Sequence, residues 1–188
     1  MLTREQATEL LHSHMPQENL RAHSLAVAVV MQKLALRLEQ DADLWYLTGL
    51  LHDIDYAYTV DDPSRHALHA MELLAGADLP EEALHAIRAH NDHESRESLL
   101  DRALWAVDPL TGLITASALM RPDHSVSAIV LKSIRKKFKS KAFAAGANRE
   151  QIASCEDLGV PLADFLMLSI EAMGEVEREL GLGEAHGE

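Results

Sequence analysis

Cysteine is nearly absent from this sequence of 188 residues. Its one cysteine, Cys155, excludes an internal disulfide framework and a zinc module built on cysteine ligands. Aromatic residues make up 4% of the chain, and no stretch alternates apolar and polar residues long enough to predict a strand. No apolar run reaches the ~18–20 residues that a membrane span requires. These absences favour a helical protein without a membrane-spanning segment.

Basic residues are also scarce, since 17 Lys and Arg stand against 30 Asp and Glu, a formal net charge of −13. Nucleic-acid binders carry a basic footprint, so we expect no nucleic-acid polymer as a partner. The charged N-terminal sequence lacks the apolar run of a signal peptide, so we expect a cytoplasmic protein with no membrane partner. The sequence leaves the oligomeric state open.

Leucine and alanine dominate the chain, and their spacing together with capping signals predicts helices almost throughout. The expected helices span residues 3–13, 18–39, 41–54, 64–76, 80–91, 97–120 with a kink at Pro109, a short segment after 125, a helix from 148 and a last one over 161–180. The tail, residues 181–188, is expected to fray.

We therefore expect an all-α fold, a single compact helical bundle that forms one domain over residues 1–188. Its motif-bearing core covers about residues 20–115, and the helices of residues 125–180 pack on that core.

Histidine is abundant, with 11 residues, and several histidines fall on or beside the apolar faces of the expected helices. Four histidines and two aspartates from five helices share this placement: His23, His52, Asp53, His66, His90 and Asp108. In the helix expected over residues 41–54, Gly49 lies one turn before Asp53 and would let another backbone approach closely.

Each of these six side chains alone is typical of a hydrogen-bonded core residue or a helix cap. Two inward carboxylates, however, need partners. Imidazole and carboxylate groups suit Zn, Mn, Fe, Co or Ni, and helical bundles build one-metal and two-metal sites from inward-pointing ligands of this kind. Together the six residues indicate a metal site.

The ordered set resembles the HD superfamily of metal-dependent phosphohydrolases. The segments that carry the resemblance are HSLAVAVVMQKLA, GLLHDID, HALHAMELL, AIRAHN and AVDPLTGLI. The resemblance implies that one divalent ion is held by four side chains: His23, His52, Asp53 and Asp108. In two-metal members His66 and His90 are added and Asp53 bridges the ions. His69 competes with His66 on the same expected helix, and the family's spacing favours His66.

The sequence departs from two subgroups of that superfamily. Ile54 and Asp55 stand where one subgroup has Ile-Gly, and there is no GYP element, so cyclic-dinucleotide activity is not carried over. No Glu-Asp pair follows the doublet, which disfavours guanosine-tetraphosphate hydrolysis.

The expected activity is hydrolysis of a small phosphorylated substrate such as a nucleotide, with one or two divalent ions (Mn, Fe, Co, Ni, Zn or Mg) as cofactor. Such an ion lowers the pKa of a bound water towards about 7 and polarises a phosphoryl oxygen. Asp53 and Asp55 are the expected catalytic residues. By position, His69, Asn91 and His93 are further candidates for a proton shuttle or a substrate contact.

Phosphate recognition needs local positive charge in so acidic a chain. The stretch of residues 132–141 holds six of the 17 basic residues. It is either a solvated helix face or a lid in which Lys132, Arg135 and Lys136 contact substrate phosphate. Arg21 is a second candidate phosphate contact.

Two other functions fit the same residues. One is a di-iron oxygenase on the six-residue ligand set, and the other is a metal-binding module without catalytic activity.

Overall fold

The computed structural model describes residues 1–183, and within these residues the chain forms helices, turns and loops but no strand. The helices are α1 (Arg4–His14), α2 (Glu18–Arg37), α3 (Ala42–Leu51), α4 (Tyr56–Thr59), α5 (Leu68–Leu74), α6 (Glu81–Ala89), α7 (Leu99–Leu119), α8 (Leu131–Lys139), α9 (Arg149–Ala153) and α10 (Leu162–Glu175), with 3-10 turns η1 (Pro63–Arg65) and η2 (Ser154–Leu158). The expected all-α fold is confirmed. Residues 184–188 of the tail lie outside the described residues.

Side-chain caps set several helix starts where the sequence predicts them. Thr3 and Gln6 form a capping box at α1, since each side chain accepts the other residue's backbone N–H. The Asp41 carboxylate caps α3. Ser98 and Asp101 form a second capping box at the start of α7. These caps place α3 and α7, which both carry residues of the site described below.

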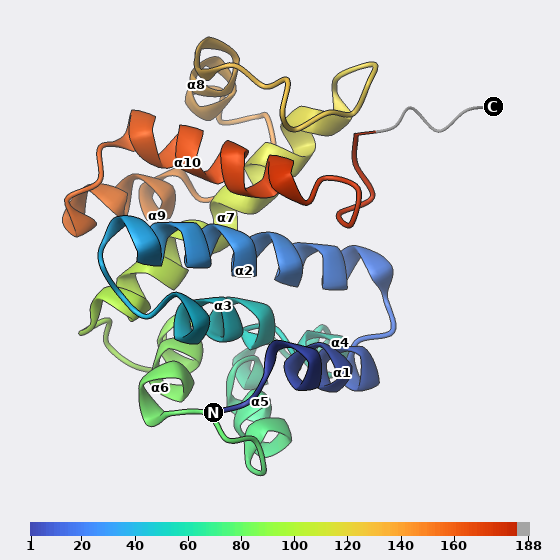
Figure 1. Ribbon diagram of the computed structural model, residues 1–188, viewed down its shortest axis with the longest axis vertical. Coiled ribbons are helices and arrows are strands. Elements are labelled where there is room, and N and C mark those ends of the chain that lie inside the picture. The colour runs from blue at the N-terminus through green and yellow to red at the C-terminus, as the bar shows by residue number, and fades with distance from the viewer. Residues whose placement is uncertain (184–188) are drawn as a thin grey trace.

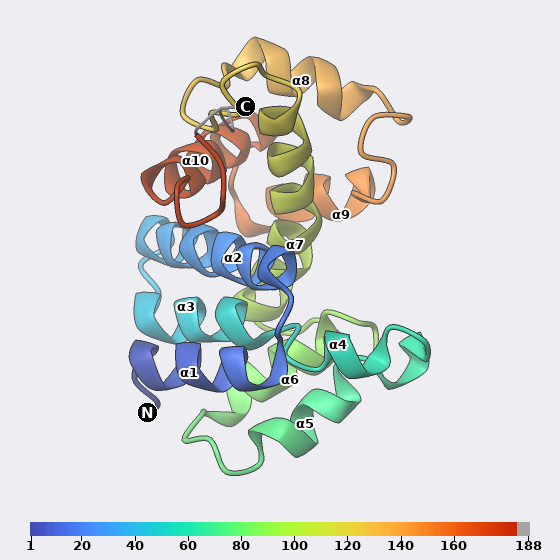
Figure 2. The same cartoon turned by 90° about the vertical axis from the view of Figure 1, so that its right-hand side faces the viewer.

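The helices stack in layers around α2 (Figures 1 and 2). α2 lies between α10 on one side and α3 on the other, α1 lies beyond α3, and α7 runs across the stack. One apolar cluster joins residues of α2, α7 and α10, and a second joins residues of α1, α3, α5 and α6. The candidate site takes side chains from elements of both clusters. In the described residues, no helix has the length and apolar character to cross a bilayer.

Helices α2 and α3 pack closely at Gly49. A Cβ atom on Gly49 would lie 2.9 Å from Ala28 Cα and 3.1 Å from Met31 Cγ. The close approach expected from the sequence is confirmed. It fixes the spacing between His23 on α2 and His52 at the end of α3.

Three expected elements are wrong in extent or type. The helix expected over residues 64–76 begins only at Leu68, because Ala67 has φ of 68° and breaks it, so His66 precedes the helix instead of sharing its face. The segment after 125 forms turns, since the Glu177 carboxylate accepts the N–H groups of Val126 and Ser127 at 2.9 and 3.1 Å. The last helix ends at Glu175, and turns follow over residues 176–180.

The polar run after His52 also differs from expectation, because it contains the short helix α4. The basic stretch forms α8, which is one helix. The organisation of residues 1–188 as one domain stays a prediction.

Candidate metal centre

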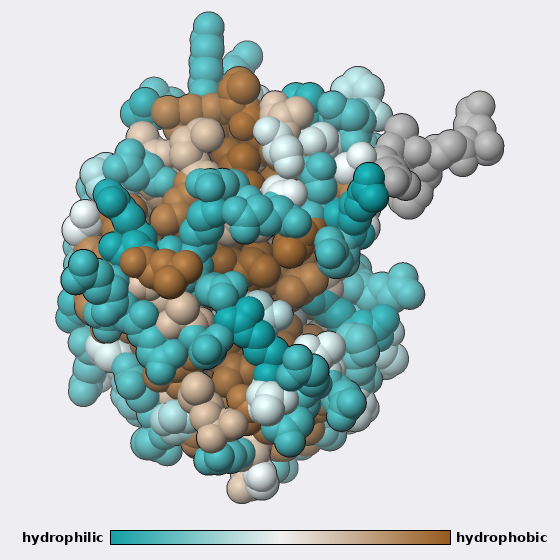
Figure 3. All heavy atoms as spheres, viewed as in Figure 1, coloured by the Kyte–Doolittle hydropathy of each residue, from teal (hydrophilic) through white to brown (hydrophobic). Residues whose placement is uncertain are grey.

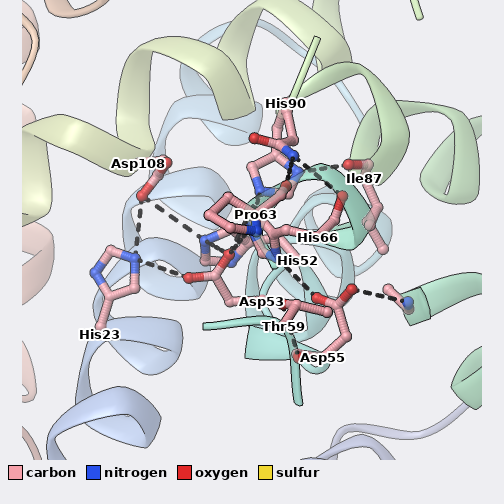
Figure 4. A network of polar contacts seen from close by, with 12 residues as sticks. His23, His52, Asp53, Asp55, Thr59, Pro63, His66, Ile87, His90 and Asp108 are labelled. Atoms are coloured by element: carbon pink, nitrogen blue, oxygen red, sulfur yellow. Dashed lines mark hydrogen bonds and ion pairs between the residues drawn. The ribbon is translucent and has the colours of Figure 1, made fainter. Parts of the chain in front are cut away.

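Six side chains that lie up to 85 positions apart in the chain converge between α2, α3, α6 and α7 (Figure 4). His23 comes from α2 and Asp108 from the middle of α7. His52 is the C-cap of α3, and Asp53 follows it in the turn. The two remaining members are His66, just before α5, and His90, the C-cap of α6.

Each of the four imidazole rings is held through Nδ1, so that Nε2 points into the cluster. The Nδ1 partners are Thr111 Oγ1 for His23 at 3.2 Å, Gly49 O for His52 at 2.8 Å, Asp55 Oδ1 for His66 at 2.9 Å, and Ile87 O for His90. The Thr111 hydroxyl donates to Asp108 O at 2.9 Å, so it accepts from His23. Such outer hydrogen bonds fix the tautomer and orientation of metal-binding histidines.

The Nε2 atoms lie at coordination spacing from the two carboxylates. The distances are 3.0 Å from His23 to Asp108 Oδ1, and 3.3, 3.1 and 3.4 Å from His52, His66 and His90 to Asp53 Oδ1. Donor atoms about 2.1 Å from one ion lie ~3.0 Å apart in octahedral and ~3.4 Å apart in tetrahedral geometry. The Nε2–Oδ distances therefore match the spacing between neighbouring donor atoms around one metal ion.

Asp53 lies between two groups of donor atoms. Its Oδ2 faces His23 at 3.7 Å, whereas its Oδ1 faces the other three imidazoles. Two overlapping triplets have donor atoms within 4.8 Å of one another: His23, His52 and Asp108, and His52, Asp53 and His90. His66 adjoins the second triplet, since its Nε2 lies 3.2 Å from His90 Nε2. The arrangement could hold one or two divalent ions.

The fit to a cation is clearest at His52. Its side chain is fully buried, and its Nε2 has no hydrogen-bond partner within the described residues. The Gly49 carbonyl accepts from Nδ1, which leaves a lone pair on Nε2 of the neutral ring. A buried polar atom without a partner is costly, and a divalent ion at this point would satisfy it.

The six side chains also perturb one another's protonation. Burial disfavours the charged form of His52, but the Asp53 and Asp108 carboxylates outweigh it and raise the pKa of His52 to about 9. Burial likewise opposes the charge on His66, yet Asp53 and Asp55 raise its pKa to about 10. In the opposite direction, burial favours neutral carboxyls, but the surrounding histidines hold the pKa values of Asp53 and Asp108 below their ordinary range.

Two hollows open onto the cluster, and both include His23 and Asp108. The larger, of about 570 Å³, is lined by three of the other cluster members and by side chains that include Tyr56, Trp105, Asn91, Asn148 and Gln151. The smaller, of about 390 Å³, is bounded by Ala144, Gly146 and Ala147 in the loop before α9. Sequence reasoning missed Asn148 and Gln151 as site residues, because neutral amides at helix starts carry no spacing signal and Asn148 also caps α9.

Three polar candidates hold His66 in place. Asp55 is fully buried, and besides His66 Nδ1 it accepts the Ala70 N–H at 3.0 Å. Asn91 and His93 both donate to the His66 carbonyl, at 3.1 and 2.7 Å. Asp55 lines neither hollow, and its contacts are those of a residue that positions His66, so its expected catalytic role stays a prediction.

The remaining candidates for substrate contact lie apart from the cluster. The Arg21 guanidinium donates to the carbonyls of Met15 and Pro16 and lines a hollow beside α1. His69 bonds to Glu72, and its ring contacts Tyr58.

The three basic candidates of α8 also lie outside the hollows of the cluster. Lys132, Arg135 and Lys136 line a separate hollow along α8. The structure therefore does not bring these side chains, or Arg21 and His69, to the cluster.

The chain belongs to the HD domain family, which matches residues 20–119, more than half of its length. This match confirms the resemblance drawn from the motifs. HD-type sites bind divalent metals and are typical of hydrolases that act on phosphoesters. No solved structure matches the chain.

Several relatives are ribonucleases. Ribonuclease Y of Desulfotalea psychrophila is 30% identical over 160 residues, which cover 82% of this chain and 31% of that protein. Ribonuclease Y of Lawsonia intracellularis is 29% identical over 167 residues, 87% of this chain and 32% of that protein. Ribonuclease Y of Aliarcobacter butzleri is 35% identical over 94 residues, 50% of this chain and 18% of that protein. The chain thus spans less than a third of each of these relatives.

These relatives correct the expectation that excludes a nucleic-acid polymer as partner. Their name states that they act on RNA. The exclusion is wrong because a net charge of −13 is a sum over the whole chain, whereas phosphate recognition depends on local charge, including that of any bound cation.

Proposed function

We propose that this chain is a divalent-metal-dependent phosphohydrolase that cleaves phosphoester bonds of RNA, with two ions held by the six-residue cluster. The observation that carries the proposal is the arrangement of the four imidazoles. Each is oriented through Nδ1, and each presents Nε2 to Asp53 or Asp108 at the spacing expected of two donor atoms on one ion.

In this proposal a first ion would be held by His23, His52 and Asp108, and a second by His66 and His90. Asp53 would contribute to both sites, because its Oδ2 faces His23 and its Oδ1 faces His66 and His90. When bound, such ions supply a nucleophilic water at neutral pH and stabilise charge on a phosphoryl group. The chain's own contribution is to fix the donor atoms and to keep the carboxylates ionised.

The larger hollow supports a nucleotide unit as the group next to the cluster. Trp105 and Tyr56 offer aromatic surface, and Asn91, Asn148 and Gln151 offer amide groups. Aromatic faces stack on unpaired bases, and amides hydrogen-bond to base edges. RNA is favoured over a free nucleotide by the ribonuclease relatives.

Asp53→Ala tests the proposal. The wild-type chain, purified without chelator, is analysed for metal content, then stripped and reloaded separately with Mn, Co, Ni, Zn and Mg. We expect hydrolysis of an RNA oligonucleotide with at least one of these metals. In the variant we expect loss of metal and of hydrolysis, at least 10³-fold in rate as an order of magnitude for removing such an electrostatic group, with helical circular dichroism retained.

The matched control is Asp157→Ala, which removes an exposed carboxylate in η2 and should keep full activity. Full activity of Asp53→Ala would refute the mechanism. Two bound irons with oxygen consumption and no hydrolysis would favour the oxygenase instead. Hydrolysis of nucleoside monophosphates but not of RNA would restrict the substrate to small phosphoesters.

A further inference from the structure

Four cations form a stripe along one face of α8. Lys132, Arg135, Lys136 and Lys139 are all exposed, and at 100° per residue they fall within an arc of about 100°. The stripe runs about 10 Å along the helix axis, at ~1.5 Å per residue. The opposite face of α8 is anchored by Ile134, which is fully buried. We refer to these four residues as the α8 stripe.

The α8 stripe has no carboxylate partner, unlike several other basic side chains of this acidic protein. Lys33 pairs with Glu171 at 2.7 Å and Arg96 with Asp92 at 2.7 Å. Within the described residues, no ion pair involves a member of the α8 stripe. Four like charges on one face repel each other.

Helix stability does not account for the stripe. The helix dipole favours cations in the last turn, which suits Lys136 and Lys139 but not Lys132 in the first turn. The dipole therefore offsets the repulsion only at the C-terminal end of α8, and the uncompensated charge of Lys132 points to an external anion.

The α8 stripe is connected to the candidate metal centre by one loop. Residues 140–147 leave the C-terminus of α8 and pass along α7 to α9, which Figure 2 shows at one side of the molecule. This loop supplies Ala144, Gly146 and Ala147 to the smaller hollow at the cluster. The Arg149 guanidinium braces it by donating to carbonyls of both α8 and the loop, among them Phe138 at 3.0 Å and Ala144 at 2.9 Å.

The exposed surface over α8 combines hydrophilic and hydrophobic atoms. Figure 3 shows hydrophilic atoms that stand out at the top of the molecule, where Figure 1 places α8, with hydrophobic atoms beside them. Leu131 lies beside the stripe in the hollow of about 740 Å³ that Lys132, Arg135, Lys136 and Lys139 line. The surface thus combines unpaired cations with aliphatic stems, a combination that suits an extended polyanion.

We propose that the α8 stripe is a docking surface for the phosphate backbone of single-stranded RNA, remote from the metal centre but on the path of the same strand. The inference rests on the proposed function, since it assumes that the strand's cleaved bond lies at the cluster. Charge complementarity selects a polyanion, and the aromatic lining of the larger hollow selects an unpaired nucleic acid. The stripe holds the strand, and the cluster acts on it.

The proposal is tested by binding, which separates it from hydrolysis. The probe is a fluorescein-labelled single-stranded RNA of 20 nucleotides, titrated with the full chain in chelator, and fluorescence anisotropy is read at several salt concentrations. For Lys132→Gln/Lys136→Gln we expect a Kd about tenfold higher at low salt. We also expect the slope of log K against log salt to flatten by ~1.4, because two phosphate contacts are lost. Glutamine keeps the helix propensity of lysine.

The matched control is Arg37→Gln/Arg102→Gln, which removes the same charge from exposed positions away from α8. We expect its Kd to stay within twofold of wild type. Equal weakening by both double variants would overturn the proposal, since only overall charge would then matter. Absence of RNA binding, or binding of vesicles containing anionic lipid in place of RNA, would also overturn it. Binding is measured in chelator, where no metal-dependent hydrolysis takes place. The binding result can therefore be interpreted even if the proposed function is wrong.

Discussion

Gly49→Ala probes the contact that sets the geometry of the candidate metal centre. The added Cβ would lie 2.9 and 3.0 Å from Ala28 Cα and N, both backbone atoms, and 3.1 Å from Met31 Cγ. The Met31 side chain can change its rotamer, whereas the α2 backbone can make room only if the whole helix shifts. Overpacking of this kind costs about 1–3 kcal/mol. Alanine returns up to ~1 kcal/mol of helix propensity, so we expect a net loss of about 1–2 kcal/mol.

Urea denaturation of the chelator-treated protein measures this loss. With a slope of about 2 kcal/mol per molar urea, the midpoint should fall by about 0.5–1 M. Gly112→Ala is the matched control, because Gly112 also lies inside a helix but an added Cβ would have no atom within 4 Å. Its midpoint should rise by up to ~0.5 M, since only the propensity changes.

The same substitution should weaken metal binding. Gly49 O accepts from His52 Nδ1, and α2 carries His23, so a shift between the two helices moves both ligands. Outer-ligand changes typically cost 10–100-fold in metal affinity, and we expect about tenfold by calorimetry. A midpoint and an affinity equal to wild type would refute both the tight packing and its link to the centre.

Four more outcomes are expected. Asp55→Ala should weaken metal binding next to His66 about 10–100-fold and lower the number of metal ions bound per chain in calorimetry. Two metal ions bound with wild-type affinity would contradict a positioning role for Asp55. Arg149→Leu should lower stability by about 1–3 kcal/mol in thermal denaturation, because backbone carbonyls of residues 137–147 lose a charged donor; an unchanged Tm would contradict this. With the pKa values of His52 and His66 raised to about 9 and 10, metal binding should release protons and strengthen from pH 6 to 9, by about tenfold per pH unit for each proton displaced; buffer-independent heats would argue against it. In chelator, the same raised pKa values should stabilise the fold fully below pH ~6.5, an effect lost as pH rises through 9 to 10.

Helix positions and the identity of the cluster residues are local properties, and the sequence predicts them well. The cap at Thr3 and the spacing of apolar residues locate α1 and α2. Gly49 indicates a close approach before any partner helix is known. The His52-Asp53 doublet at the end of an apolar run predicts a buried polar pair, and the ordered motifs indicate the other four residues.

The sequence predicts secondary structure less well where a residue distant in the chain takes the backbone groups that a helix would use. Glu177, about 50 residues away, takes the amides of Val126 and Ser127 and prevents the helix expected there. The positive φ of Ala67 removes His66 from α5 and turns it towards Asp55. No local pattern encodes either contact, because each depends on a partner brought close only by folding.

The sequence by itself determined an all-α chain, a set of inward histidines and aspartates, and membership of a metal-binding family. Tertiary structure alone decided which of the polar candidates reach the cluster. Asp55 holds His66, Arg21 bonds to nearby carbonyls, and the cations of α8 lie apart from the hollows at the cluster. The physical reason is that helical periodicity specifies the direction of a side chain from its own helix, whereas its neighbours depend on how the helices pack.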